Sequence, residues 1–259
     1  LPGAIQMRQM LGHQLVHASF RLRHRLWVIL VQQGDHLSHR RRAATPPCVH
    51  LLLSARQLPN EVVESLNYYF ELMVDIIMRH HGVVDKYMGD AIMAFFGAPE
   101  RTRYEAVQAV ESGFDMLESL GDFNRWQTEK GRPGFRIGIG INYGVVTVGN
   151  IGSEKKMDYT VIGDMVNLAA RLETLTKIYK QELIVSESVY REISKALPCR
   201  LIDKVQVLGK TQAQRIFTVK KQLSEEESRG WQHHHKGLKL YFQRHFAEAA
   251  EHFRQAGSL

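Results

Sequence analysis

Apolar side chains recur every three to four residues along residues 60–82 and again along residues 103–130. This spacing places the apolar positions on one face of a helix, so both segments are predicted to be amphipathic helices that pack on a core. Between them, residues 83–96 hold two apolar runs on either side of a Gly-Asp pair that ends at Asp90. That pattern predicts a β-hairpin with a carboxylate in its turn.

The second half of the chain alternates strand-like and helix-like segments. Glycines punctuate residues 135–141 and 144–149, and this pattern predicts a second hairpin. A later strand leads into a helix that carries Asn167 and Arg171 on one face. The remaining expected elements are a strand over 182–186, a helix over 187–196, and strands over 201–208 and 215–220. The alternation predicts an α+β domain, with one mostly antiparallel sheet and helices packed on it.

Three segments of the chain resemble the catalytic core of the class III nucleotidyl cyclases, the adenylate and guanylate cyclase family. They are the hairpin sequence at 84–97, the glycine-rich stretch at 136–153 and the strand and helix at 157–173. The resemblance covers about residues 58 to 220. It implies a ferredoxin-like cyclase domain of the bacterial adenylate cyclase type over residues 58–222. The implied activity is that of a lyase in signal transduction, which converts ATP into 3′,5′-cyclic AMP and pyrophosphate.

The resemblance assigns roles to residues that suit this chemistry. The ribose 3′-hydroxyl attacks the α-phosphate while pyrophosphate leaves, and hard cations held by carboxylates can stabilise the charge on both oxygens. Asp90 matches one of the family's two metal-binding aspartates, so two Mg²⁺ or Mn²⁺ ions per site are expected. Asn167 matches the residue that positions the ribose, and Arg171 the one whose planar guanidinium meets the phosphates. The alternatives are a solvated turn aspartate, a capping asparagine and a surface arginine.

Purine choice rests on Lys86 and Thr160, which match the family's purine-contacting pair. Lysine can donate to N1 of adenine, an acceptor, whereas guanine has a donor there, so Lys86 favours ATP over GTP. The Thr160 hydroxyl can accept from the adenine amino group, although many family members have aspartate at this position. Lys210 matches a lysine that binds the polyphosphate. That match is short, and a solvated loop lysine is the alternative.

In this family the metal aspartates come from one protomer and the purine and transition-state residues from the other. This chain holds both sets, so the resemblance implies a homodimer with two equivalent sites. The alternative is a degenerate module that dimerises, binds nucleotide or transmits a signal. A second carboxylate near Asp90 would discriminate the two, because the family's first metal aspartate ends the first strand. Asp35 follows the apolar run 26–31 but lies too far upstream, and no acid occurs between His36 and Asn60.

Residues 1–57 differ in composition from the rest of the chain. They hold eight arginines, no lysine and a single acid, and so carry the whole formal net charge of +7. The remaining residues are neutral as a set, so nucleic-acid binding is not expected. The resemblance begins abruptly where this composition ends. We therefore hypothesise that residues 1–57 are frameshifted or replaced, and disordered or irregularly packed, so that the sheet lacks its first strand.

The last segment, residues 223–259, is predicted to be a linker followed by the start of a helical repeat. Residues 224–228 are polar, and residues 237–253 resemble the helix-turn-helix of a tetratricopeptide repeat, which would dock a protein partner or further repeats. The longest apolar run is too short to span a membrane, and two cysteines define no disulfide framework. The catalytic domain is therefore expected in the cytoplasm, although a parent protein could be attached to a membrane outside this segment.

Overall fold

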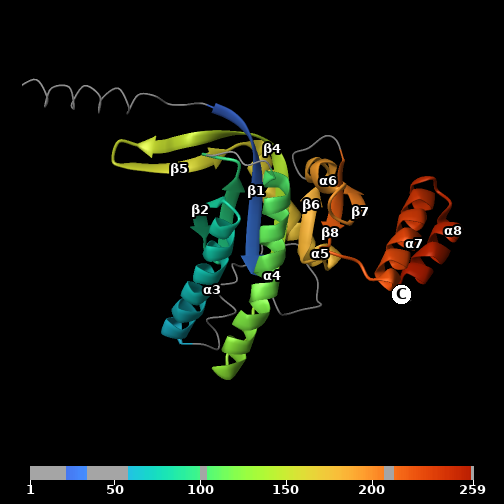
Figure 1. Ribbon diagram of the computed structural model, residues 1–259, viewed down its shortest axis with the longest axis horizontal. Coiled ribbons are helices and arrows are strands. Elements are labelled where there is room, and N and C mark those ends of the chain that lie inside the picture. The colour runs from blue at the N-terminus through green and yellow to red at the C-terminus, as the bar shows by residue number, and fades with distance from the viewer. Residues whose placement is uncertain (1–21, 34–57, 100–103, 207–212, 258–259) are drawn as a thin grey trace, which may run out of the picture.

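One sheet organises the chain, with helices packed on both of its faces (Figure 1). The computed structural model describes residues 22–33, 58–99, 104–206 and 213–257, and of residues 22–33 only the backbone. The strands are β1 (Leu22–Gln33), β2 (Gly82–Met88), β3 (Ala91–Phe96), β4 (Ile137–Ser153), β5 (Lys156–Ile162), β6 (Leu183–Ser186), β7 (Cys199–Val205) and β8 (Gln214–Val219). The helices are α3 (Pro59–Arg79), α4 (Glu105–Glu129), α5 (Asp164–Tyr179), α6 (Glu187–Ile193), α7 (Glu225–Phe242) and α8 (Phe246–Gly257).

The strand order across the sheet is β2-β3-β1-β4-β6-β8-β7, and β5 pairs with β4 off this path. Within the described strands only the β4–β6 pairing is parallel, and the other pairings are antiparallel. The α+β fold with a mostly antiparallel sheet is therefore confirmed. The first hairpin and the two amphipathic helices predicted from periodicity are also present, as β2–β3, α3 and α4.

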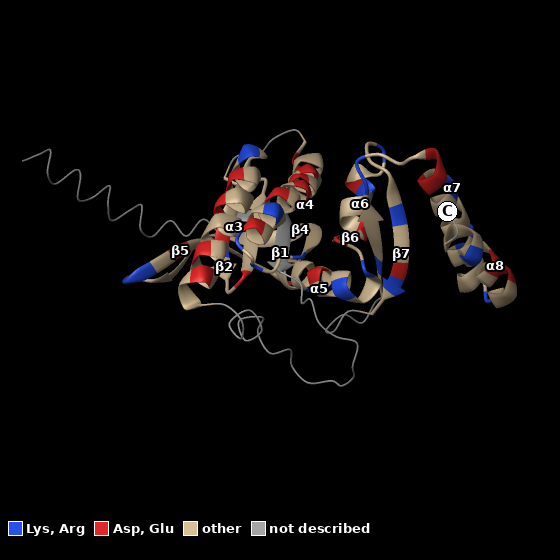
Figure 2. Cartoon of the chain, turned by 90° about the horizontal axis from the view of Figure 1, so that it is seen from below, with Lys and Arg blue, Asp and Glu red and all other residues tan. Residues whose placement is uncertain are grey.

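Strand β3 shows how the two faces of the sheet are covered. Every residue of β3 is buried, which requires packing on both sides because successive side chains of a strand point in opposite directions. Ile92, Ala94 and Phe96 join the core formed with α3, α4 and α6, whereas Met93 and Phe95 join a second cluster that α5 covers. Figure 2 shows α3 and α4 on one side of the sheet and α5 on the other.

The structure differs from the sequence prediction at the first strand. Strand β1 lies in the middle of the sheet, pairing with β3 on one side and with β4 on the other. Its apolar run, Leu26 to Val31, suits a strand covered on both faces, and backbone pairing extends the strand beyond that run. The sheet therefore begins well before residue 58. The hypothesis of a replaced segment otherwise concerns residues 1–21 and 34–57, which lie outside the described residues.

The predicted second hairpin was wrong. Residues 137–153 form one continuous strand, β4, and the chain turns back only after Ser153 into β5. The glycines of β4 do not mark turns. A Cβ at Gly140 would overlap the carbonyl oxygen of Ala169 and the amide nitrogen of Glu173, so glycine is needed there for α5 to approach the sheet.

Two antiparallel helices, α7 and α8, close the described chain, as predicted, while their membership of a tetratricopeptide repeat stays a prediction. The polar residues 224–228 form the start of α7. Ser224 and Glu227 form a capping box at the N-terminus of α7, and a short connection joins this helix to β8. Arg200 of β7 stacks over Trp231 of α7, with its guanidinium carbon 5.4 Å from the ring centroid. Within the described residues, none of the helices combines the length and the apolar character that a membrane crossing requires.

Candidate active site

Asp90 lies in the turn between β2 and β3, where the sequence predicts it. Gly89, just before it, has φ +67, a conformation that glycine adopts without a steric penalty. The hairpin can therefore reverse within two residues and continue into the buried strand β3. Asp90 itself is half-buried at the start of that strand.

Two buried side chains lie close enough to Asp90 to respond to its charge. Burial raises the pKa of the Tyr69 hydroxyl on α3, and the charge of Asp90 raises it further. Burial also raises the pKa of Glu173 on α5 to about 7. Lys177 and a hydrogen bond from Thr174 oppose that rise, and Asp90 adds to it. Burial is the main cause of both shifts, so the side chains around Asp90 are poorly solvated, and little water screens the attraction between its carboxylate and a cation.

Glu173 was missed by sequence reasoning. Its side chain is 1% exposed, and its Oε1 atom is buried without a hydrogen bond to any of the described residues. The nearest ammonium group, Lys177 Nζ, lies 3.9 Å from that oxygen. A glutamate in the middle of a helix ordinarily faces water, so nothing in the local pattern signals its burial.

Strand β1 ends beside the turn that holds Asp90, because its register pairs Val31 with Ile92 near the start of β3. The resemblance predicts an aspartate at the end of this strand, but the last residue is Gln33, and Asp35 lies outside the described residues. Over the described ranges, no three His, Cys, Asp or Glu side chains form a group that could hold a metal ion. Asp90 suits a divalent cation as one carboxylate ligand, but the described side chains do not supply a ligand set for two ions.

The structure brings Lys86 and Thr160 together through a third residue, Asp85. The Thr160 hydroxyl Oγ1 lies 2.9 Å from Asp85 Oδ1 and 2.7 Å from Oδ2, and donates to this carboxylate. The backbone N–H of Val161 donates to Oδ2 at 3.2 Å. Lys86 Nζ forms an ion pair with Oδ1 at 3.3 Å, and its side chain is 43% exposed. Strands β2 and β5 thus place both predicted purine contacts at one spot.

Asp85 was also missed by sequence reasoning, because its orientation depends on an irregularity in the sheet. The pairing of β2 with β3 shifts between Val84, opposite Ala94, and Lys86, opposite Met93. Two steps along β2 therefore match one step along β3, which makes Asp85 the extra residue of a β-bulge. A bulge changes the direction of a side chain, and strict alternation along the strand would not predict it.

Asn167 and Arg171 lie one helical turn apart on α5, as their spacing predicts. The adjacent face of α5 is anchored by Leu168 and Leu172, which pack with Ile184 of β6 and Ile216 of β8. Asn167 is exposed and Arg171 is half-buried. The Nη1 atom of Arg171 is buried and has no hydrogen-bond partner among the described residues. The pair is therefore oriented by the helix, with one guanidinium donor available.

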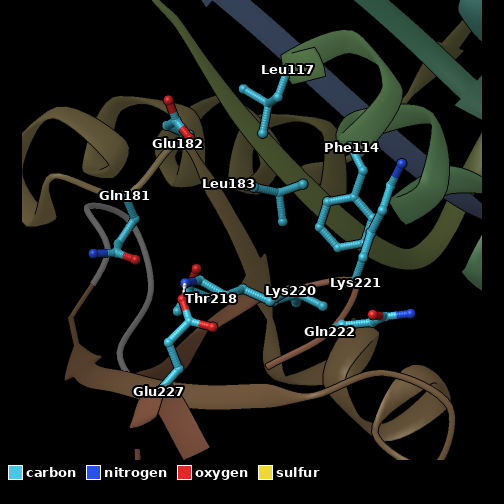
Figure 3. Close-up of a pocket in the computed structure, with 11 residues that line it drawn as sticks. Phe114, Leu117, Gln181, Glu182, Leu183, Thr218, Lys220, Lys221, Gln222 and Glu227 are labelled. Carbon is cyan, nitrogen blue, oxygen red and sulfur yellow. Dashed lines mark hydrogen bonds and ion pairs between the residues drawn. The ribbon is translucent and has the colours of Figure 1, made fainter. Parts of the chain in front are cut away.

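Lys210 lies outside the described residues, so its predicted role stays a prediction. A cavity of about 630 Å³ opens near the start of α7 and is lined from α4, β6 and β8 (Figure 3). Phe114 and Leu183 form part of its apolar wall, and Lys220 and Glu227, which form an ion pair, lie at its other side. None of the predicted site residues that the structure describes lines this cavity. The candidate site is therefore a separate region of the chain.

Comparison of the chain with known sequences gives a family match. Residues 50–221 match the family described as the adenylate and guanylate cyclase catalytic domain. An adenylate cyclase of Anabaena cylindrica is 40% identical over 174 residues, which cover 65% of this chain and 34% of that protein. Adenylate cyclase 1 of Rhizobium meliloti (strain 1021) is 31% identical over 167 residues, which cover 64% of this chain and 25% of that protein. The matched region is thus a minor part of each of these longer relatives.

Solved structures show the same architecture. The adenylyl cyclase CyaB from P. aeruginosa superposes with a TM-score of 0.67 and 28% identity, covering 79% of this chain and 97% of that one. The guanylyl cyclase Cya2 superposes with a TM-score of 0.64 and 32% identity, covering 76% of this chain and 92% of that one. Because the two neighbours are named for different purines, overall similarity does not determine which nucleotide this chain uses.

Proposed function

We propose that this chain, which belongs to the adenylate and guanylate cyclase family, converts ATP into 3′,5′-cyclic AMP and pyrophosphate. The observation that carries the choice of ATP is the placement of the exposed Lys86 ammonium beside Thr160. An ammonium group can only donate hydrogen bonds. It can pair with N1 of adenine, which accepts, but not with N1 of guanine, which carries a hydrogen. The relatives named as adenylate cyclases support this choice.

The α5 pair would serve the bond-forming step. The ribose 3′-oxygen forms a bond to the α-phosphorus and loses its proton, while the bond from that phosphorus to the bridging oxygen of pyrophosphate breaks. Asn167, exposed on α5, would hold the ribose in line for this attack. Arg171 would donate to phosphate oxygens as their charge grows. A buried N–H without a partner is costly, and a phosphate oxygen would satisfy Nη1.

Divalent cations would supply charge neutralisation at the phosphates when they are bound. Asp90 would provide one ligand from the β2–β3 turn, beside buried and poorly solvated side chains. Among the described residues, no group of three or more His, Cys, Asp or Glu side chains stands ready to hold the expected pair of ions.

We also propose that the active form is a homodimer. The β4–β5 hairpin projects beyond the rest of the sheet (Figure 1). On it, Met157 is 49% exposed and Tyr159 is 41% exposed, and on neighbouring β2 Tyr87 is 51% exposed. Large apolar side chains gathered on projecting strands are typical of an interaction surface. A second copy would cover them and bring the Asp90 turn of one chain to the α5 residues of the other.

One observation favours the second candidate function, a regulatory module without turnover. Strand β1 ends in Gln33, where an aspartate would otherwise complete the metal site. Such a module would keep nucleotide binding and dimerisation but would not form a cyclic product.

The direct test is to incubate the purified chain with ATP or GTP in Mg²⁺ or Mn²⁺ and to quantify cyclic nucleotides by chromatography, with Asp90→Asn as the control. Cyclic AMP that depends on Asp90 is the expected result. A preference for GTP would contradict the assignment of ATP. Nucleotide binding with no product, in a folded dimer, would favour the regulatory module.

A further inference from the structure

We infer that Asp85 is a positioning residue for purine selection, because it fixes the Thr160 hydroxyl as a hydrogen-bond acceptor toward the substrate. This inference rests on the proposed use of ATP and extends it to a residue that does not itself touch the nucleotide. Three features of the structure support it: the burial of the carboxylate, the contacts that it makes, and the direction in which the Thr160 hydroxyl proton must point.

The Asp85 side chain is 1% exposed, so its hydrogen bonds come from the protein. The β-bulge in β2 turns it toward β5, where Thr160 Oγ1 and the Val161 N–H both donate to it. The Lys86 ammonium lies 3.3 Å from its other oxygen. A buried carboxylate with three donors around it acts as an acceptor only.

Proton counting then determines what Thr160 can offer to a ligand. A threonine hydroxyl has one proton and two lone pairs. Both oxygens of Asp85 lie within 2.9 Å of Oγ1, so the proton is directed to the carboxylate. Thr160 is only 6% exposed, so few water molecules compete for that proton. The lone pairs of the hydroxyl remain, and they can only accept.

The resulting pattern of one hydrogen-bond donor and one acceptor is complementary to adenine. Lys86 donates and Thr160 accepts, and adenine presents the complement, an acceptor at N1 and an amino donor at C6. Guanine presents a donor at N1 and a carbonyl acceptor at C6, so its carbonyl would face the Thr160 lone pairs. A site built for a specific hydrogen bond rejects the mismatched ligand strongly, because its polar groups are left unpaired. If Asp85 were absent, the hydroxyl could rotate and donate, and this rejection would weaken.

The experiment measures kcat/KM for ATP and for GTP in the full chain, and separately the Kd of unreactive ATP and GTP analogues. Asp85→Ala should lower the ATP to GTP ratio of kcat/KM at least about tenfold, mainly by raising relative GTP use. Asp203→Ala is the matched control, because Asp203 accepts a hydrogen bond from the Tyr179 hydroxyl at 2.7 Å on another strand. That variant should leave the ratio unchanged.

Two further variants separate polarity from a general structural effect. Asp85→Asn keeps an acceptor oxygen, which the Val161 N–H holds toward Thr160, so most of the ATP preference should remain. Thr160→Val removes the hydroxyl at nearly constant volume. It should lower the ratio to a similar extent, and adding Asp85→Ala to Thr160→Val should not lower it further.

The outcomes are distinguishable. If wild type prefers ATP and neither Asp85→Ala nor Thr160→Val changes the ratio in turnover or binding, the role of Asp85 is overturned while the proposed function stands. If Asp85→Ala does not fold, as judged by circular dichroism, Thr160→Val alone decides in the same way. A wild-type chain that shows no preference for ATP in turnover or in analogue binding overturns the proposed function and this inference together.

Discussion

The backbone of Glu173 in α5 packs against Gly140 of β4, with no side chain between the helix and the strand. This contact sets how closely α5 approaches the sheet, and α5 carries both Asn167 and Arg171. It also removes the Glu173 carboxyl from water, since that side chain lies at the same helix–strand contact. One glycine therefore affects the position of α5 and the charge state of a buried acid.

We expect Gly140→Ala to lower the free energy of unfolding by about 1–3 kcal/mol or more, because the new methyl group would overlap backbone atoms of α5 that cannot rotate away. Urea denaturation followed by circular dichroism measures the change. Gly121→Ala in α4 is the control, because its Cβ would meet nothing within 4 Å and alanine favours helix. Equal stability of Gly140→Ala and wild type would show that α5 does not pack as described.

Glu173 predicts a pH dependence of stability. Its pKa in the folded chain is about 7 against an ordinary value of 4.5, so between these pH values the folded chain binds a proton that the unfolded chain does not. The contribution to stability is therefore fully present below pH 4.5 and is lost as pH rises through 7. The loss is on the order of 1–3 kcal/mol. Glu173→Gln has no titrating carboxyl, so its free energy of unfolding in urea titrations should rise relative to that of wild type between pH 5 and pH 8. Parallel profiles would argue against a buried acid with a raised pKa.

Periodicity predicted the parts of the fold in which local pattern and tertiary packing agree. The amphipathic helices α3 and α4 and the β2–β3 hairpin are examples, and the spacing of Asn167 and Arg171 on α5 follows from helix geometry alone. The sequence predictions fail where the local structure depends on packing or pairing with a distant segment of the chain. Gly140 suggests a turn in the sequence, but in the structure it allows α5, about thirty residues further along the chain, to approach the sheet. The bulge at Asp85 likewise arises only from the pairing of β2 with β3.

The end of β1 gives a prediction about the metal site. Gln33 lies at the end of a strand whose register brings it to the Asp90 turn, so Gln33→Asp would place a carboxylate there. We expect cyclic AMP formation to rise and the Mg²⁺ concentration for half-maximal activity to fall by roughly tenfold. The matched control is Gln32→Asp, which puts the same charge one residue earlier on the opposite face of the strand. Equal effects of the two variants would indicate a general charge effect instead of a ligand position.

Purine choice should follow hydrogen-bond polarity. Lys86→Glu combined with Thr160→Cys replaces a donor with an acceptor and removes the hydroxyl held by Asp85. We expect kcat/KM for ATP to fall and the relative use of GTP to rise by at least about tenfold. Competition assays with both nucleotides in one mixture measure the ratio directly. If the double variant kept the wild-type ratio, purine recognition would lie elsewhere in the chain.

Subunit complementation tests most directly the central claim that two chains share each active site. Asp90→Asn alone should be inactive, and Arg171→Ala should be slower by about a hundredfold or more, the effect of losing one transition-state donor. When equal amounts exchange subunits, half of the dimers should be mixed, and each mixed dimer should hold one intact site. Cyclic AMP formation should then recover to about a quarter of the wild-type rate. No recovery, in a mixture shown by native mass spectrometry to contain mixed dimers, would contradict the shared site.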